Sequence, residues 1–185
     1  PKISENINKA RRWFHEAFES LGFNGHYYYC YCTKSSHFSF VLDEVLKSNA
    51  QLETSSAYDI DLIRALHKQK KIDKKIRIIC NGFKPEAYTS KIKALIKDGF
   101  SNVIPILDNM EELDAFADFD KDLNIGMRMA AEEEPNYQFY TSRLGIRQRD
   151  LIPFYIEKIK PNSHLNLKML HFFIDSGIKD SAYYW

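Results

Sequence analysis

The sequence predicts an α/β protein in which parallel strands form a sheet with helices packed outside it. Six short apolar segments alternate with segments whose apolar residues recur at helical spacing. The strand segments begin roughly every 25 residues, as expected of right-handed crossovers between parallel neighbours. They are also nearly continuous in apolar residues, which is typical of strands that are covered on both faces.

The first strand is expected at residues 27–34, after a leading helix within residues 1–25. With a period of two, its side chains divide into Tyr27, Tyr29, Tyr31 and Thr33 on one face and Tyr28, Cys30, Cys32 and Lys34 on the other. The first face is bulky and the face that carries Lys34 is narrow. We therefore expect Lys34 at the carboxyl end of the strand, partly buried on the inner side of the sheet.

The remaining elements follow in alternation. Strands are expected at 51–56, 76–83, 102–108, 123–129 and 165–174. Helices are expected at 38–46, 60–66, 85–96, 110–116 and 151–159. Pro85 suits a helix start, and Asn81 with Gly82 stops the third strand. Residues 130–145 have no clear period and are interpreted as a loop.

Two architectures fit this order: a doubly wound open sheet, or an eight-stranded (β/α) barrel of which only six strands are present. No glycine-rich turn follows the first strand, which weakens the dinucleotide-binding alternative. Polar residues stand at the strand ends, where a barrel builds its active site. They are Lys34, Glu53 to Ser56, Asn81, Asp108, Arg128, Asp175 and Ser176. This distribution favours the barrel.

Composition excludes several classes of function. The 26 basic and 25 acidic residues are mixed along the chain, so no nucleic-acid partner is expected. No apolar run is long enough to span a membrane, and no charged-then-apolar stretch opens the given sequence, so we expect neither a membrane segment nor a signal peptide. Cys30, Cys32 and Cys80 are odd in number and lie in predicted strands, which favours a reducing, cytoplasmic location. No cysteine or histidine pair has ligand spacing, and we expect no metal site.

A lysine at a strand end can act as a Schiff-base nucleophile, because partial burial favours its neutral amine. On position alone, an ordinary surface lysine is the simpler interpretation of Lys34. The choice between the two depends on the rest of the sequence.

A set of short motifs runs in order from Tyr27 to the C-terminus: YYYCYCTKSS, ETSSAYDI, ICNGFK, IGMRM, TSRLGI and LKMLHFFIDSGI. In order and spacing this set resembles the fold-type III pyridoxal-phosphate decarboxylases, which act on ornithine, arginine, diaminopimelate or carboxynorspermidine. It is most similar to the arginine and ornithine branch. The resemblance implies an alanine-racemase-like barrel, pyridoxal 5′-phosphate as cofactor, a basic amino acid as substrate and a homodimeric complete enzyme.

The resemblance also implies roles for individual residues. Lys34 would hold the cofactor covalently, Glu53 matches an acidic residue at the end of the second strand, and Asp59 matches an acid near that lysine; the resemblance implies a catalytic role for all three. Arg128 and Ser176 match cofactor-binding positions, Ser176 at the phosphate, and residues 142–145 match a serine-to-glycine segment of the family. A buried or rim ion-pair network is the rival interpretation of Glu53, Asp59 and Arg128.

Two positions depart from the family pattern. Phe173 stands where a histidine usually stacks on the pyridine ring, and it can stack but cannot transfer a proton. Asp175 replaces a glycine beside the phosphate. These departures keep open a non-catalytic relative that binds the cofactor or a regulatory partner.

The family's barrel has eight strands and is followed by a β-rich domain. We therefore expect residues 1–185 to be a partial barrel domain, with a leading helix in 1–25 and strands one to six in 26–185, inactive by itself. The expected activity of the longer enzyme is decarboxylation of an arginine-like or ornithine-like amino acid for polyamine synthesis. Diaminopimelate or carboxynorspermidine decarboxylation remains an alternative, as does an unrelated α/β domain with polar strand ends.

Overall fold

The structure, a computed structural model, describes residues 2–130 and 144–173. The chain divides into two compact units, Pro1–Ile104 and Pro105–Trp185, and the division falls within one strand. In both units the strands are parallel and follow one another in chain order, separated by helices. The predicted α/β alternation is confirmed.

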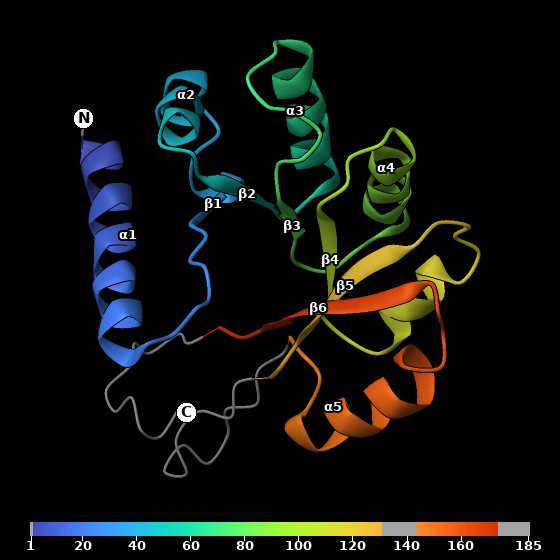
Figure 1. The fold of residues 1–185 in the computed structure, drawn as a ribbon. Helices are drawn as coiled ribbons and strands as arrows, with labels where there is room; N and C mark the ends of the chain where they lie inside the picture. Colours follow the sequence, from blue (N-terminus) through green and yellow to red (C-terminus); the bar gives the residue numbers. More distant parts are fainter. Residues whose placement is uncertain (1, 131–143, 174–185) are drawn as a thin grey trace, which may run out of the picture. The chain divides into compact units, whose positions relative to one another are not determined.

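The first unit holds three strands, the start of a fourth, and four helices (Figure 1). Its elements are α1 (Lys2–Leu21), β1 (Cys30–Cys32), the 3₁₀ turn η1 (Thr33–Ser35), α2 (Ser39–Lys47), β2 (Gln51–Thr54), α3 (Ala57–Lys68), β3 (Ile78–Cys80), α4 (Glu86–Lys97) and the beginning of β4 (Val103–Leu107). In Figure 1, α2, α3 and α4 lie on the same side of β1, β2 and β3. The strand positions agree with the prediction, although each strand is shorter than its apolar segment.

The two faces of the first unit's sheet differ in chemistry. Side chains toward the helices are fully buried, among them Leu52, Thr54, Ile78 and Cys80. The tyrosine face of β1 also packs outward, since Tyr29 and Tyr31 contact a core cluster of Ile7, Val45 and Ala50. On the opposite face Cys30, Cys32, Gln51 and Glu53 are only half-buried. The predicted division of the first strand into a bulky outer face and a narrow inner face is confirmed.

All four helices of this unit end in the same way. The residue after each helix cap is in the left-handed region: Gly22 (φ 62), Asn49 (φ 54), Lys70 (φ 60) and Gly99 (φ 92). The next N–H then donates to a carbonyl five residues back, for example Lys71 N to Leu66 O at 3.0 Å. This is the Schellman arrangement, which satisfies carbonyls that the helix leaves free. It turns the chain sharply into the next strand.

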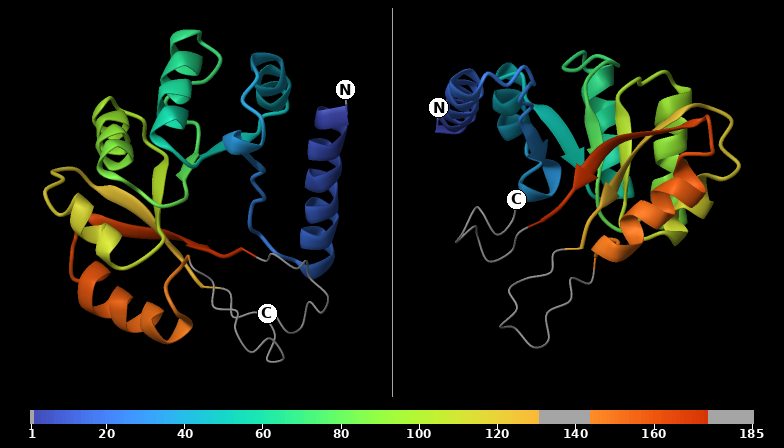
Figure 2. Two further views of the ribbon diagram at one scale, coloured as in Figure 1. Left: turned by 180° about the vertical axis from the view of Figure 1, so that it is seen from behind. Right: turned by 60° about the horizontal axis from the view of Figure 1, so that its bottom comes forward.

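The second unit contains the rest of β4, the 3₁₀ helix η2 (Glu111–Phe116), β5 (Leu123–Arg128), α5 (Gln148–Phe154), the π-helical turn η3 (Tyr155–Ile159) and β6 (Leu165–His171). Figure 2 shows β5 and β6 side by side. Gly126 of β5 leaves room for both neighbouring strands, because a Cβ there would lie 2.4 Å from Ile106 Cδ1 of β4 and 3.2 Å from Met169 Cβ of β6. The α-helix predicted at 110–116 is instead a 3₁₀ helix, since its turns are closed by i to i+3 bonds such as Leu113 N to Met110 O.

Lys70, with φ 60, allows the energetic cost of a left-handed residue at a helix end to be tested. A non-glycine residue in the left-handed region costs about 1–2 kcal/mol, and glycine removes that cost while making the unfolded chain more flexible. We expect Lys70→Gly to raise the free energy of unfolding by about 0.5–1 kcal/mol. The exposed Ala65→Gly, within the same helix, should lower it by about 1 kcal/mol. Urea denaturation measures both, and a loss of stability in Lys70→Gly would contradict this account.

Candidate active site at the carboxyl ends of the strands

Lys34 lies in the turn that directly follows β1. Its side chain is exposed, and its ε-amine forms no hydrogen bond or ion pair with any described residue. The strand ends at Cys32, two residues earlier than predicted, and the expected partial burial of Lys34 is wrong. The cause is Thr33, which is fully buried and donates its Oγ1 hydroxyl to Glu53 O at 3.0 Å. The chain leaves the strand here and enters the 3₁₀ turn Thr33–Ser35, in which Lys34 is exposed.

Glu53 lies next to this turn. Parallel register pairs it with Cys32, so both side chains are on the inner face. Asn81 Nδ2 donates to Glu53 Oε1 at 3.1 Å. Burial raises the pKa of the Cys32 thiol, the Glu53 carboxylate raises it further, and Lys34 opposes both. A carboxylate, a thiol and the Lys34 turn therefore share one edge of the first unit's sheet.

Asp59 has a structural role in the described residues. Its Oδ2 accepts from Ser55 N at 2.9 Å and from Ser56 Oγ at 3.0 Å. Ser56 Oγ in turn caps α3 by accepting from Asp59 N at 3.4 Å. This reciprocal pair resembles a capping box and stabilises the first turn of α3. Helix capping is sufficient to explain an acid at this position.

A buried polar network beneath this edge was missed by sequence reasoning. Tyr88 of α4 is 1 % exposed, and its hydroxyl shares a 2.8 Å hydrogen bond with Thr54 Oγ1. The same hydroxyl donates to Asn81 O at 3.4 Å, and burial raises the pKa of Tyr88. In the sequence Tyr88 is one of several apolar positions on a helix stripe. A polar strand end followed by a tyrosine in the next helix was the available signal.

Arg128 ends β5 in the second unit. Its guanidinium is nearly buried, with Nη1 3.7 Å from Asp108 Oδ1. The Arg128 Cζ atom lies 6.0 Å from the centre of the Phe173 ring, which is 55 % exposed. Arg128, Asp108 and Phe173 therefore meet at the ends of β4, β5 and β6. The ion pair agrees with the rival interpretation of Arg128, and the open Phe173 ring retains a face for stacking.

Part of the predicted site lies outside the described residues: Asp175, Ser176, and residues 142 and 143 of the serine-to-glycine segment.

Gly145, at the end of that segment, is described, and its N–H donates to Asp108 O at 2.8 Å. Its φ is 103°, and a Cβ there would lie 2.6 Å from Ala130 N. Glycine is required at this position because the backbone passes directly over the ends of β4 and β5.

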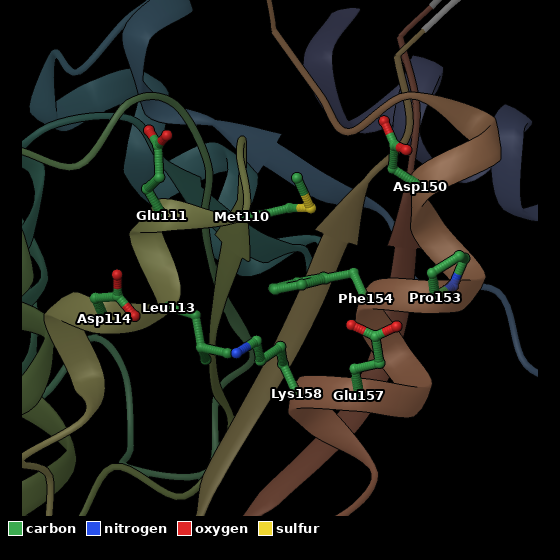
Figure 3. A pocket seen from close by; sticks show the side chains of 9 residues that line it. All are labelled: Met110, Glu111, Leu113, Asp114, Asp150, Pro153, Phe154, Glu157 and Lys158. Carbon is green, nitrogen blue, oxygen red and sulfur yellow. The ribbon is translucent and has the colours of Figure 1, made fainter.

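A groove of about 350 Å³ lies elsewhere in the second unit, between η2 and the helix formed by α5 and η3 (Figure 3). Its lining residues are Met110, Glu111, Leu113, Asp114, Asp150, Pro153, Phe154, Glu157 and Lys158. Figure 3 shows the Phe154 ring extending across the groove toward Leu113 and Met110. None of the predicted site residues lines it, so it is separate from the strand-end site.

Within residues 2–130 and 144–173, no group of three or more histidine, cysteine or acidic side chains could hold a metal ion. No described helix is long and apolar enough to cross a membrane. All three cysteines are free thiols.

These features define a class of fold: parallel strands in chain order that alternate with helices, with polar side chains at their carboxyl ends, as in part of a (β/α) barrel. The chain is 26 % identical to a biosynthetic arginine decarboxylase of Phocaeicola vulgatus over 96 % of its own length and 30 % of the relative's. It is 24 % identical to an arginine decarboxylase of Solanum lycopersicum, covering 96 % of this chain and 38 % of that protein. The chain thus spans between a quarter and two fifths of the curated relatives it matches. No protein-family model matches it.

Solved structures agree in fold. The biosynthetic arginine decarboxylase of Campylobacter jejuni matches with a TM-score of 0.72 and 22 % identity, over 94 % of this chain and 28 % of that one. Diaminopimelate decarboxylase of Helicobacter pylori matches with a TM-score of 0.65 and 17 % identity, over 92 % and 42 %. The sequence matches to arginine decarboxylases confirm the resemblance to fold-type III pyridoxal-phosphate decarboxylases, in the arginine branch. The solved structures confirm the partial-barrel fold.

The three thiols should differ in reactivity. Burial raises the pKa of Cys30 to about 11 and of Cys80 to about 11. At pH 8 roughly one molecule in a thousand then carries either thiolate, since each pH unit is a tenfold change. We expect iodoacetamide to modify Cys32 first, with Cys80 slowest because it is also fully buried. Peptide mass mapping over time measures the order, and equal rates in the native protein would contradict it.

Proposed function

We propose that this chain is part of a pyridoxal-phosphate-dependent decarboxylase that acts on a basic amino acid such as arginine or ornithine. The observation that carries the proposal is the exposed Lys34 amine, which forms no hydrogen bond or ion pair with any described residue and lies in the turn after β1, where Cys32 pairs in register with Glu53. Similarity to arginine decarboxylases along nearly the whole chain supports it. Diaminopimelate decarboxylation is the second candidate, favoured by the structural likeness to that enzyme.

Each unit, taken by itself, holds a residue that suits the cofactor. In the first unit the exposed Lys34 offers the amine that an aldehyde cofactor requires. In the second unit the exposed Phe173 ring offers an aromatic surface on which a ring can stack. Pyridoxal phosphate, when bound, supplies an electron sink for the bond to the carboxylate that is lost. Lys34 would anchor it, Glu53 would place negative charge beside that anchor, and Arg128 would place positive charge at the strand ends. Ser176 would bind the phosphate, and Asp59 would order the loop after β2.

We also propose that residues 1–185 form a partial barrel domain of a longer, homodimeric, cytoplasmic protein. The greater length of the relatives supports this, and so does β6, where Leu170 is 62 % exposed and the next strand-end residue, Phe172, is 39 % exposed. Further strands pairing with β6 would cover these side chains. The three free thiols support a reducing location.

Borohydride reduction tests the cofactor role. The longest expressible chain is incubated with pyridoxal phosphate, reduced, digested and mapped by mass spectrometry. We expect the label on Lys34, its loss in Lys34→Ala and its retention in Lys47→Ala, which alters an exposed lysine at the end of α2. A folded chain that takes no label at Lys34 would contradict the proposed role.

Carbon dioxide release tests the substrate. Because residues 1–185 are expected to be inactive by themselves, arginine, ornithine and diaminopimelate are offered separately to the complete, cofactor-loaded protein, with Lys34→Ala as the inactive control. Turnover of arginine or ornithine is expected. Turnover of diaminopimelate alone would support the second candidate, and a loaded protein without turnover would support a non-catalytic relative.

A further inference from the structure

We infer that Asn81 is a positioning residue that fixes the orientation of the Glu53 carboxylate on the inner face of the sheet, with Tyr88 holding Asn81 in place. The placement of Glu53 is a property of the chain itself. Its consequence for decarboxylation rests on the proposed function.

Asn81 is tied to β2 at two points. Its backbone N–H donates to Thr54 O at 2.9 Å, and its Nδ2 donates to Glu53 Oε1 at 3.1 Å. The residue is 8 % exposed, whereas Glu53 is half-buried. The two contacts connect the ends of neighbouring strands, so the amide donor stands at a fixed place relative to the β2 backbone.

The backbone around Asn81 has little freedom to move. The buried Tyr88 hydroxyl donates to Asn81 O at 3.4 Å and is itself joined to Thr54 Oγ1. Gly82 follows with φ +81°, and a Cβ there would lie 3.3 Å from Ser55 O. Asn81 is thus held by β2 on one side and by α4 beneath. Because the donor is fixed, the flexible Glu53 side chain must adopt the orientation that meets it.

The chemistry of an amide suits this role. A carboxylate has two oxygens with several acceptor sites, and Asn81 is bonded to Oε1. The neutral amide orients the carboxylate without cancelling its charge, whereas a lysine or arginine would cancel it. Glu53 therefore keeps its negative charge facing Cys32 and the turn that carries Lys34. Loss of the donor would leave the charge in place and remove its fixed direction.

A double-mutant cycle tests the inference in the longest expressible chain, with Asn81→Ala, Glu53→Gln and the double variant. The first readout is the pH midpoint of Cys32 alkylation by iodoacetamide, which requires neither cofactor nor turnover. Glu53→Gln should lower the midpoint, because it removes the charge that disfavours the thiolate. Asn81→Ala should shift the midpoint when Glu53 is present and produce no further shift in the Glu53→Gln background. An unchanged midpoint, or the same shift in both backgrounds, would overturn the inference.

The matched control is Asn102→Ala. Asn102, like Asn81, donates a hydrogen bond through Nδ2, but its acceptor is the backbone carbonyl of Lys75, at 2.6 Å. It lies before β4, at the opposite end of the strands. It should leave the Cys32 midpoint unchanged. If Asn81→Ala does not fold, Asn81→Asp combined with Glu53→Gln exchanges donor and acceptor across the same pair. This exchange should restore the melting temperature lost in Asn81→Asp alone, and failure to restore it would count against the pair.

The second readout is turnover. Asn81→Ala should reduce kcat about 10- to 100-fold, as expected when a reacting group loses its orientation, with no further loss in the Glu53→Gln background. An unchanged kcat would contradict a positioning role in the reaction. If no amino acid is turned over by the unmodified protein, the proposed function fails, and the Cys32 readout still decides whether Asn81 orients Glu53.

Discussion

Parallel pairing in register is the constraint on which the candidate site depends. Because β1, β2 and β3 run in the same direction, their carboxyl ends reach a common edge. Two further bonds extend this alignment beyond the ladders: Thr33 Oγ1 to Glu53 O, and Asn81 N to Thr54 O. The loops that follow the strands therefore begin from fixed positions. Polar side chains far apart in the sequence are collected there.

The buried hydrogen bonds of Tyr88 and Thr54 stabilise the strand ends that carry Asn81 and Glu53. Tyr88 and Thr54 are buried, and their hydroxyls share a hydrogen bond. Without this bond, each buried hydroxyl would cost about 1–3 kcal/mol. This hydrogen bond fixes α4 against the ends of β2 and β3. Above it, Glu53 and the Lys34 turn remain accessible. A rigid buried network next to accessible polar groups holds the strand ends in a fixed geometry.

Sequence patterns predicted the elements better than their ends. All six strands were located, because apolar runs and helical stripes are local signals. The first strand was predicted too long, because Thr33 and Lys34 continue the alternation of side chains between its two faces. In the structure the strand ends at Cys32, and Thr33 begins a turn in which its hydroxyl donates to Glu53 O of β2. The helix at 110–116 was assigned the wrong type, since a segment of six residues carries too little periodicity to separate 3₁₀ from α geometry. Lys34 lies in the turn after the strand instead of at its end, and its role in cofactor binding stays a prediction.

The sequence by itself determined the α/β alternation, the inner and outer faces of the first strand, and the polar residues at the strand ends. These follow from spacing within one segment. The tertiary structure decided which of those residues meet. Asn81 and Glu53 are 28 positions apart, and Tyr88 and Thr54 are 34 apart, so only strand register and helix packing could join them. Only the fold, likewise, revealed that Asp59 caps a helix and that Arg128 pairs with Asp108. A carboxylate in a sequence does not specify its partner, because the partner is chosen by distance in space.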